Sequence, residues 1–291
     1  MNSKSRSRLS VAIITCNEAS RIRRCLASVR WADEIVVVDT GSTDGTPAIC
    51  REFTPWVYEY PWEGFARSKN RALAHTSGPW ILSLDADEVV SEPLQAEILA
   101  LLESPPTGIE GFYIPRKNFI WGKWIRHGGF YPDYQLRLFK RDAGRFAEKA
   151  VHESVTVTGK TGYLRSPLYH YTYRDSADLF ARGERYATLA ATELSGRERF
   201  RLSRLLWRPL GRFCKIFLVQ RGFLDGIPGL ILAGFYAFYV FQRYVKLWEM
   251  EKGYIGREED TTSRKGSHLA HSPAREQSLV DRDRRSGAEP E

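Results

Sequence analysis

Residues 80–88 read Trp-Ile-Leu-Ser-Leu-Asp-Ala-Asp-Glu, and they combine a fold signal with a chemical one. The run from Trp80 to Leu84 is apolar and rich in strand-forming residues, as is typical of a buried parallel strand. Asp85 and Asp87 follow it at once. Because open α/β sheets bind their ligands at the carboxyl ends of their strands, this stretch predicts a strand that delivers two carboxylates to a binding crevice.

Strand and helix patterns alternate on both sides of that stretch. Strands are predicted at 9–15, 34–39 and 57–60. Helices are predicted over 22–29, 65–75 and 92–102, and another opens at 43–47, with a capping residue and a proline near its first turn. Repeated βα units of this length predict an α/β fold, with a parallel sheet and helices on both faces. Residues 109–172 hold short alternating runs, which predict strands and loops that extend the sheet. From 176 to 250 the pattern is helical.

The composition limits the class of protein. The chain has 291 residues, of which 43% are hydrophobic and 27% charged, so a wholly disordered, collagen-like or polytopic membrane protein is excluded. The four cysteines lack CxxC spacing and are expected to be buried thiols in a reducing compartment. The basic arm at residues 1–8 precedes an apolar run too short for a signal peptide, so a cytoplasmic protein is expected.

The positive charge lies mostly near the C-terminal end. The net charge is +8, and residues 197–250 contribute ten Lys/Arg against three acidic residues. Arg204, Arg208 and Arg212 share one helical stripe, while Leu206 and Leu210 share another. A basic amphipathic helix of this kind predicts association with an anionic membrane surface. Nucleic-acid binding is not predicted, because no recognisable motif is present and an apolar run adjoins the basic stripe.

That apolar run, residues 226–242, contains no charged residue. As a helix it would extend ~25 Å, just short of a comfortable bilayer crossing. It could dip into one leaflet, cross the membrane, or pack as a helical hairpin or dimer interface. We favour interfacial embedding. Residues 251–291 are polar, mixed in charge and without apolar periodicity, and are expected to form a disordered tail.

A second acidic residue at the end of a predicted strand supports the prediction of one binding site shared by several carboxylates. Asp39 closes the predicted strand at 34–39, so it should lie at the same sheet edge as Asp85 and Asp87. Carboxylates at i and i+2 can converge on one divalent cation, for which Mg²⁺ or Mn²⁺ is suited. The alternative is a helix-capping cluster in a loop. Neither GxGxxG nor GxxxxGK[ST] occurs, so neither a nicotinamide site nor a P-loop is supported.

Several motifs occur in an order that resembles family 2 glycosyltransferases of the GT-A fold. They are Val11-Ala-Ile-Ile-Thr-Cys-Asn17-Glu18, Val38-Asp39-Thr-Gly-Ser-Thr-Asp44-Gly-Thr46, Lys69-Asn-Arg-Ala72 and Leu84-Asp-Ala-Asp-Glu88. Arg137-Leu-Phe-Lys140 and Val151-His-Glu153 are similar to the branch that elongates the lipopolysaccharide core with glucose or a related hexose. The resemblance covers roughly residues 9–175 and implies a Rossmann-like mixed sheet flanked by helices. The helical region at 176–250 would be a membrane-associating extension.

The resemblance assigns binding roles along the first strands. Thr15, Asn17 and Glu18 would line the nucleotide pocket. Asp39 would bind the uridine or ribose of the sugar nucleotide. Asp85 would hold ribose or metal.

The resemblance also assigns a metal ligand and places two cationic side chains near the pocket. Asp87 would be the principal ligand of Mg²⁺ or Mn²⁺. Lys69 and Arg71 would lie near the diphosphate. Their alternative is a solvated helix face.

Family members resembling this chain are inverting transferases, which need a carboxylate to take the proton from the acceptor hydroxyl. Glu153 is the first candidate for this base and Asp133 the second. His152 could assist the metal or the diphosphate. Arg137 and Arg116 could meet phosphates or an anionic acceptor, or form surface ion pairs.

Trp121 and Trp124 lie among glycines in the stretch 118–134. Aromatic faces pack on sugars and glycines permit motion, which favours an acceptor-side lid; a core flap beneath the sheet is equally compatible.

The sequence therefore predicts a metal-dependent, inverting glycosyltransferase. The donor would be a nucleotide-diphosphate hexose, such as UDP-glucose, and the acceptor a lipopolysaccharide-core or other lipid-linked glycan. The enzyme would be peripheral or monotopic at the cytoplasmic face of the inner membrane. Two alternatives stay open: a polyprenyl-phosphate glycosyltransferase, and a non-catalytic membrane-bound sugar-nucleotide-binding protein. The intact carboxylates argue against the second.

Overall fold

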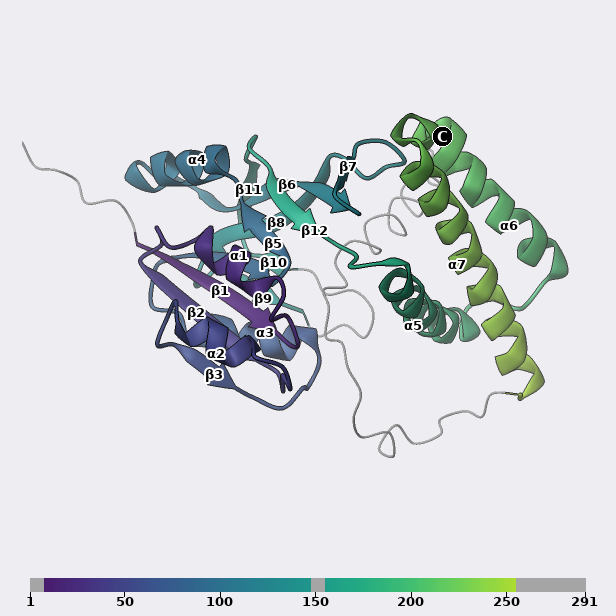
Figure 1. Ribbon diagram of the computed structural model, residues 1–291, viewed down its shortest axis with the longest axis horizontal. Coiled ribbons are helices and arrows are strands. Elements are labelled where there is room, and N and C mark those ends of the chain that lie inside the picture. The colour runs from purple at the N-terminus through teal and green to yellow at the C-terminus, as the bar shows by residue number, and fades with distance from the viewer. Residues whose placement is uncertain (1–7, 148–154, 255–291) are drawn as a thin grey trace, which may run out of the picture. The chain divides into compact units, whose positions relative to one another are not determined.

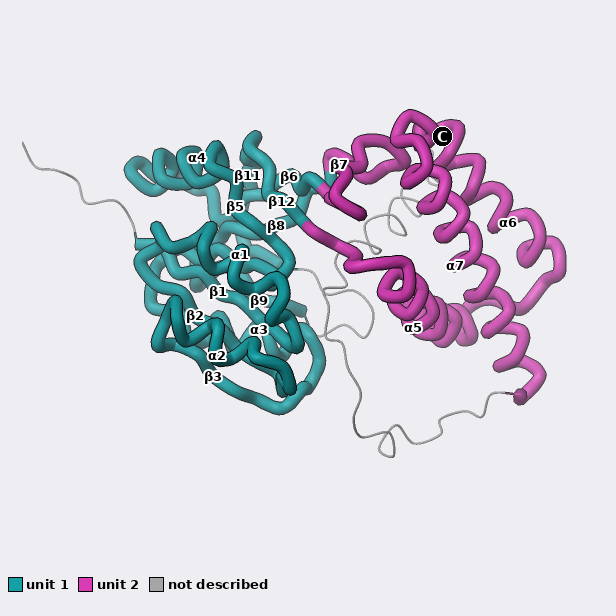
Figure 2. Tube along the Cα trace, viewed as in Figure 1, with its two compact units in different colours: residues 1–117, 133–170, 268–291 teal, residues 118–132, 171–267 magenta. Residues whose placement is uncertain are grey.

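The computed structural model describes residues 8–147 and 155–254. These residues divide into two compact units (Figure 2). The first contains residues 8–117, 133–147 and 155–170, and the second contains 118–132 and 171–254.

The first unit contains the predicted parallel strands (Figure 1). They are β1 (Leu9–Thr15), β2 (Glu34–Asp39), β3 (Val57–Glu59) and β4 (Trp80–Asp85), in the spatial order β3-β2-β1-β4. Thr15 of β1 is in register with Asp39 of β2, and Ile14 with Asp85 of β4. The carboxyl ends of three neighbouring strands therefore meet at one sheet edge, as the sequence predicted.

Antiparallel strands extend this sheet beyond β4 in the order β8-β6-β12-β5, so the predicted mixed sheet is confirmed. They are β5 (Glu88–Val90), β6 (Ile109–Ile120), β8 (Asp133–Lys140) and β12 (Leu168–Tyr171), while β11 (Lys160–Tyr163) pairs in parallel with β6. Strand β5 was not predicted. It is only three residues long and depends on pairing with β12, where His170 lies opposite Glu88.

Helices cover both faces of the parallel strands, as expected. Val11 and Ile13 of β1 belong to a core shared with helices on one face, whereas Ala12 and Ile14 point to the other. The first face carries α1 (Ile22–Ala27), α2 (Thr46–Arg51) and α4 (Glu92–Glu103). The second face carries α3 (Phe65–Ala74) and the pair β9 (Gly144–Phe146) and β10 (Val155–Val157).

The predicted opening of a helix at residues 43–47 is present. Helix α2 begins at Thr46 with a proline in its first turn, as expected. The expected capping residue is Gly45, which has no side chain to bond to the helix. Thr43 lies before the cap and donates its backbone N–H to Asn17 Oδ1 over 2.8 Å.

The second unit contains the predicted helices. It holds β7 (Lys123–Ile125), α5 (Ser176–Ser195), α6 (Leu202–Cys214), the π-helical segment η1 (Lys215–Val219), the 3₁₀ turn η2 (Gly222–Asp225) and α7 (Ile227–Lys252). Helix α7 packs against α5 and α6 and buries Leu232, Phe235 and Tyr239. Within the described part of the chain, we find no helix that is both long and apolar enough to cross a membrane.

Candidate active site

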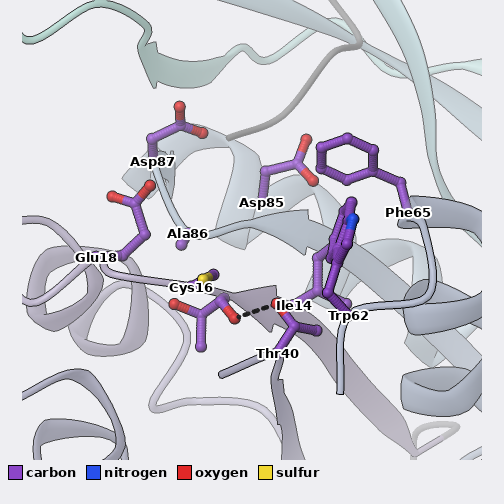
Figure 3. Close-up of a pocket in the computed structure, with 10 residues that line it drawn as sticks. Ile14, Cys16, Glu18, Thr40, Trp62, Phe65, Asp85, Ala86 and Asp87 are labelled. Carbon is purple, nitrogen blue, oxygen red and sulfur yellow. Dashed lines mark hydrogen bonds between the residues drawn. The ribbon is translucent and has the colours of Figure 1, made fainter. Parts of the chain in front are cut away.

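A cleft opens at the sheet edge where β1, β2 and β4 end (Figure 3). Its empty volume is about 320 Å³. Asp85 points toward the rings of Trp62 and Phe65, which meet edge to face, and Asp87 lies on the side of Glu18. The lining residues are Ile14, Thr15, Cys16, Glu18, Thr40, Trp62, Phe65, Asp85, Ala86 and Asp87. The predicted juxtaposition of Thr15, Glu18 and both DxD carboxylates is therefore present.

Two buried cations hold Asp85. Lys69 of α3 places its Nζ 2.8 Å from Asp85 Oδ1, and Arg137 of β8 donates from Nη2 to Asp85 Oδ2. The same Arg137 nitrogen lies 2.6 Å from Glu88 Oε1, and Glu88 in turn accepts the backbone N–H of Asp85 over 3.0 Å. All four side chains are buried. The orientation of Asp85 is thus fixed by contacts from three elements.

Asp87 also has two basic neighbours, but they lie farther away than those of Asp85. His170 Nε2 of β12 lies 3.5 Å from Asp87 Oδ1, and Arg21 Nη1 lies 3.9 Å from Oδ2. Burial would raise the pKa of Asp87, but the adjacent His170 imidazole and the charge of Arg21 outweigh it, and the pKa falls to about 2. Burial also lowers the pKa of His170, although the charge of Asp87 opposes that shift, so at neutral pH the negative charge of Asp87 is balanced chiefly by Arg21.

Behind these carboxylates lies a fully buried ion-pair chain. Arg116 of β6 binds Asp133 through Nε and Nη2, at 3.1 and 2.7 Å, and reaches Glu88 through Nη1 at 3.0 Å. The other oxygen of Asp133 accepts from Gln135 at 3.0 Å. Arg116 therefore does not form a surface ion pair. Asp133, the second candidate base, has both oxygens occupied by neighbouring donors.

The loops that follow β1 and β2 are bound to each other by hydrogen bonds. Asn17, in a left-handed conformation, donates its N–H to Ser42 Oγ and accepts from Thr43. Asp39 is buried, and its carboxylate accepts from the backbone N–H groups of Gly41 and Ser42 and from the Ser42 hydroxyl. These bonds fix the shape of the loop, and the nucleotide-binding roles of Asn17 and Asp39 stay predictions.

Glu18 connects this loop pair to the carboxylates. Its backbone N–H donates to Thr46 Oγ1 over 2.8 Å, which joins it to the start of α2. Its side chain binds Arg21 through two oxygens at 2.7 and 2.8 Å. Because Arg21 also faces Asp87, Glu18 orients the cation that helps to keep Asp87 charged.

The remaining predicted residues lie elsewhere. Arg71 stacks over Tyr60 and pairs with Glu63 at 2.7 Å, and it does not line the cleft. Trp121 and Trp124 belong to the second unit, where Trp121 is exposed at a turn and Trp124 packs edge to face on Tyr131.

Two further predictions, His152 and Glu153, lie outside the described residues.

The predicted Mg²⁺ or Mn²⁺ site fits Asp87 better than Asp85. In the described ranges, no group of three or more His, Cys, Asp or Glu side chains is arranged to hold a metal ion. The neighbours of Asp87 stand farther away than the roughly 2.7–3.2 Å of ordinary N–H···O bonds, which leaves its charged oxygens room for a ligand. Asp85 is already held by Lys69 and Arg137, so direct ligation would require one of them to yield.

Sequence reasoning missed four residues at this site: Arg21, Trp62, Glu88 and His170. The i, i+3 spacing of Glu18 and Arg21 was a usable signal for an ion pair. Trp62 is 45% exposed although it lines the cleft, and its position in a loop rich in aromatics was visible in the sequence. His170 gave no signal, because only the pairing of β12 with β5 brings it to Asp87.

The mixed sheet, with carboxylates at the carboxyl ends of its parallel strands, is the arrangement that the sequence predicted for the GT-A fold. The model of glycosyl transferase family 2 matches residues 10–172, more than half of the chain. The chain belongs to this family, and it is a glycosyltransferase.

Similar proteins span nearly the whole chain. The lipopolysaccharide core biosynthesis glycosyltransferase LpsC of Rhizobium meliloti is 30% identical over 250 residues, which are 83% of this chain and 92% of LpsC. An uncharacterized glycosyltransferase of Rickettsia felis is 32% identical over 87% of this chain and 95% of its own length. Among solved structures, the mannosyltransferase PcManGT of Pyrobaculum calidifontis, in complex with GDP-Man and Mn²⁺, is 17% identical. It covers 88% of this chain and 89% of its own, with a TM-score of 0.48.

Proposed function

We propose that this chain is an inverting, metal-dependent transferase that moves a hexose, most simply glucose, from a nucleotide-diphosphate donor to a lipopolysaccharide-core or other lipid-linked glycan. The similarity to LpsC over most of both chains supports the acceptor class. The family membership supports the activated-sugar donor. The observation that carries the proposal is Asp87, a buried carboxylate that stays charged at the rim of the cleft.

Each part of the cleft has a task in this reaction. A bound divalent cation would neutralise charge on the leaving diphosphate, and Asp87 would hold it. Lys69 and Arg137 hold Asp85 in a fixed orientation, so that it can position ribose or a water on the metal. The exposed ring of Trp62, braced edge to face by Phe65 at 4.5 Å, offers a flat surface for a base or a sugar.

The proton of the acceptor hydroxyl needs a separate base. Of the two sequence candidates, Asp133 is bound by Arg116 and Gln135 and is 2% exposed, which argues against it as a proton acceptor. Glu153 is therefore our proposed base. Replacing Glu153 with Gln should abolish transfer, whereas Asp133→Asn should act mainly through stability.

We also propose that the enzyme works at the cytoplasmic face of the inner membrane, because its acceptor is lipid-linked. The association would be at the membrane surface, peripheral or monotopic.

The test is Asp87→Asn, assayed with a panel of nucleotide sugars in the presence of Mg²⁺ or Mn²⁺. The variant keeps the shape of the side chain and removes its charge, so we expect turnover to fall by on the order of a hundredfold or more, with the thermal melting curve little changed. The matched control is Asp142→Asn, whose side chain is 93% exposed and outside the cleft.

The control variant should turn over at the wild-type rate. Full turnover by Asp87→Asn in chelator-treated buffer would refute the metal role. The absence of any nucleotide-sugar turnover by the wild-type enzyme, with a broad donor panel, would refute the proposed donor class.

A further inference from the structure

Helix α6 exposes its apolar stripe in the second unit. In a water-soluble helix the leucines face the core and the arginines face solvent. Here Leu206 and Trp207 are 58% and 68% exposed, whereas Arg212 is only 9% exposed. Arg204 is engaged with Glu198 at 2.6 Å, and Arg208 lies over the ring of Tyr244. The apolar face of this helix is therefore exposed.

The apolar face continues past the end of α6. The π-helical segment η1 prolongs the helix, and Leu218 and Val219 at its end are exposed like Leu210 and Trp207. Val219 is 76% exposed. Phe217 of the same segment contacts the exposed Phe223 of η2. We call this set the docking surface: Leu206, Trp207, Leu210, Leu218, Val219 and Phe223.

The charges around the docking surface have one sign. Residues 199–224 contain seven Lys/Arg and no Asp or Glu. Arg201, Arg208 and Arg221 are exposed. Two copies of this surface placed face to face would bring their cations together, which disfavours a second copy of the chain as the partner. An anionic bilayer accepts both features, because its acyl region takes the apolar side chains and its headgroups take the arginines.

We propose that the docking surface binds an anionic lipid bilayer, with α6 and η1 lying in the membrane interface. This inference deepens the proposed function. It rests on that function in one respect, namely that the acceptor is located at a membrane.

The docking surface is also joined to the acceptor-side stretch predicted from the sequence. Asp225, at the end of η2, accepts the backbone N–H groups of Arg126 and His127, the latter at 2.8 Å. Lys123 donates to the carbonyl oxygen of Asp225 over 2.6 Å, and Gly128 donates to that of Gln220 over 2.8 Å. Docking of η1 and η2 would therefore hold the neighbouring loop, with its tryptophans, at the membrane surface.

The experiment is co-sedimentation of the full chain with phosphatidylcholine vesicles, with and without phosphatidylglycerol. The test variant combines Leu206→Gln, Trp207→Gln and Leu210→Gln, which keep helix propensity and remove exposed apolar surface. We expect wild type to bind the anionic vesicles, and the triple variant to bind them on the order of a hundredfold more weakly. Trp56→Gln, an exposed tryptophan of the first unit, is the matched control and should bind as wild type.

A second variant tests the charges. Replacing Arg201, Arg208 and Arg221 with Gln should reduce the preference for phosphatidylglycerol by roughly ten- to a hundredfold. Wild-type binding by the apolar triple variant would overturn the proposal, and so would failure of the wild type to bind anionic vesicles. A wild-type dimer that the apolar variant converts to monomer, with vesicle binding unchanged, would assign the surface to a second copy instead.

An assay of donor hydrolysis without lipid distinguishes a failure of the proposed function from a failure of the docking-surface proposal. Both surface variants should hydrolyse the nucleotide sugar at the wild-type rate, because none of their residues lines the cleft. If no chain turns over a nucleotide sugar, the proposed function fails and the vesicle result still decides the docking surface.

Discussion

Replacing Arg116 with Met should destabilise the protein severely. Arg116 is fully buried, and it is the shared partner of the buried carboxylates of Glu88 and Asp133. Methionine fills a similar length but supplies no charge and no donor, so Asp133 loses its cation, while Glu88 keeps only Arg137, which it shares with Asp85. Breaking a buried ion pair from one side costs about 3–5 kcal/mol.

The measurement is urea unfolding followed by circular dichroism, with a thermal melt in parallel. For a chain of this size the loss corresponds to a decrease in Tm of roughly 6–20 °C. Arg51→Met is the matched control, because Arg51 pairs with Glu59 at an exposed site, and its loss should stay within about 1 kcal/mol. Arg116→Lys should fall between them, because it keeps the charge and loses the two-pronged contact.

A double variant tests the reasoning more sharply. If the cost comes from uncompensated charge, adding Asp133→Asn to Arg116→Met should restore part of the lost stability, because the amide removes the anion that has lost its cation. A loss below about 1 kcal/mol in Arg116→Met, or strictly additive losses in the double variant, would refute the account of a buried ion-pair chain.

Two further predictions concern stability. Burial alone would raise the pKa of Glu34, but hydrogen bonds from Ser10 and Ser77 outweigh burial, so the pKa in the folded state lies below the ordinary 4.5. Ionised Glu34 therefore stabilises the fold above pH 4.5. This contribution is lost as the pH falls through the folded-state pKa. Glu34→Gln should have a lower free energy of unfolding than wild type at neutral pH, and this difference should shrink below about pH 4.5. Urea titrations at both pH values measure it. A difference that is the same at both pH values would contradict the prediction. At Gly144 an added Cβ would overlap the ring of Phe139, so Gly144→Ala should cost about 1–3 kcal/mol. Gly45→Ala, where nothing lies within 4 Å, is its control, and equal melting temperatures for the two would show that the ring moves aside freely.

The parallel half of the sheet was predictable from the chain alone. Runs such as 9–15 and 34–39 are apolar throughout, and buried parallel strands require that pattern. Because parallel strands end at one edge, Asp39, Asp85 and Asp87 could be assigned to one region before any coordinates. Strand β5 could not, because Glu88–Val90 is too short to show a periodicity and becomes a strand only against β12.

Only the tertiary structure decided how the acidic residues are held. Lys69 and Arg137 converge on Asp85 from α3 and β8, and His170 reaches Asp87 from β12. No local pattern encodes such encounters, because each depends on strand order and register.

The same holds for helix α6. The sequence determined that it is amphipathic, with a basic and an apolar stripe. Which stripe faces outward depends on packing against α7, and the structure leaves Leu206 and Trp207 exposed while Arg212 is buried. The sequence by itself thus determined the fold class and the carboxylates of the site, because strand patterns and strand ends are local properties. Tertiary packing decided the partners of those carboxylates and the outward face of α6, because both depend on segments that are distant along the chain.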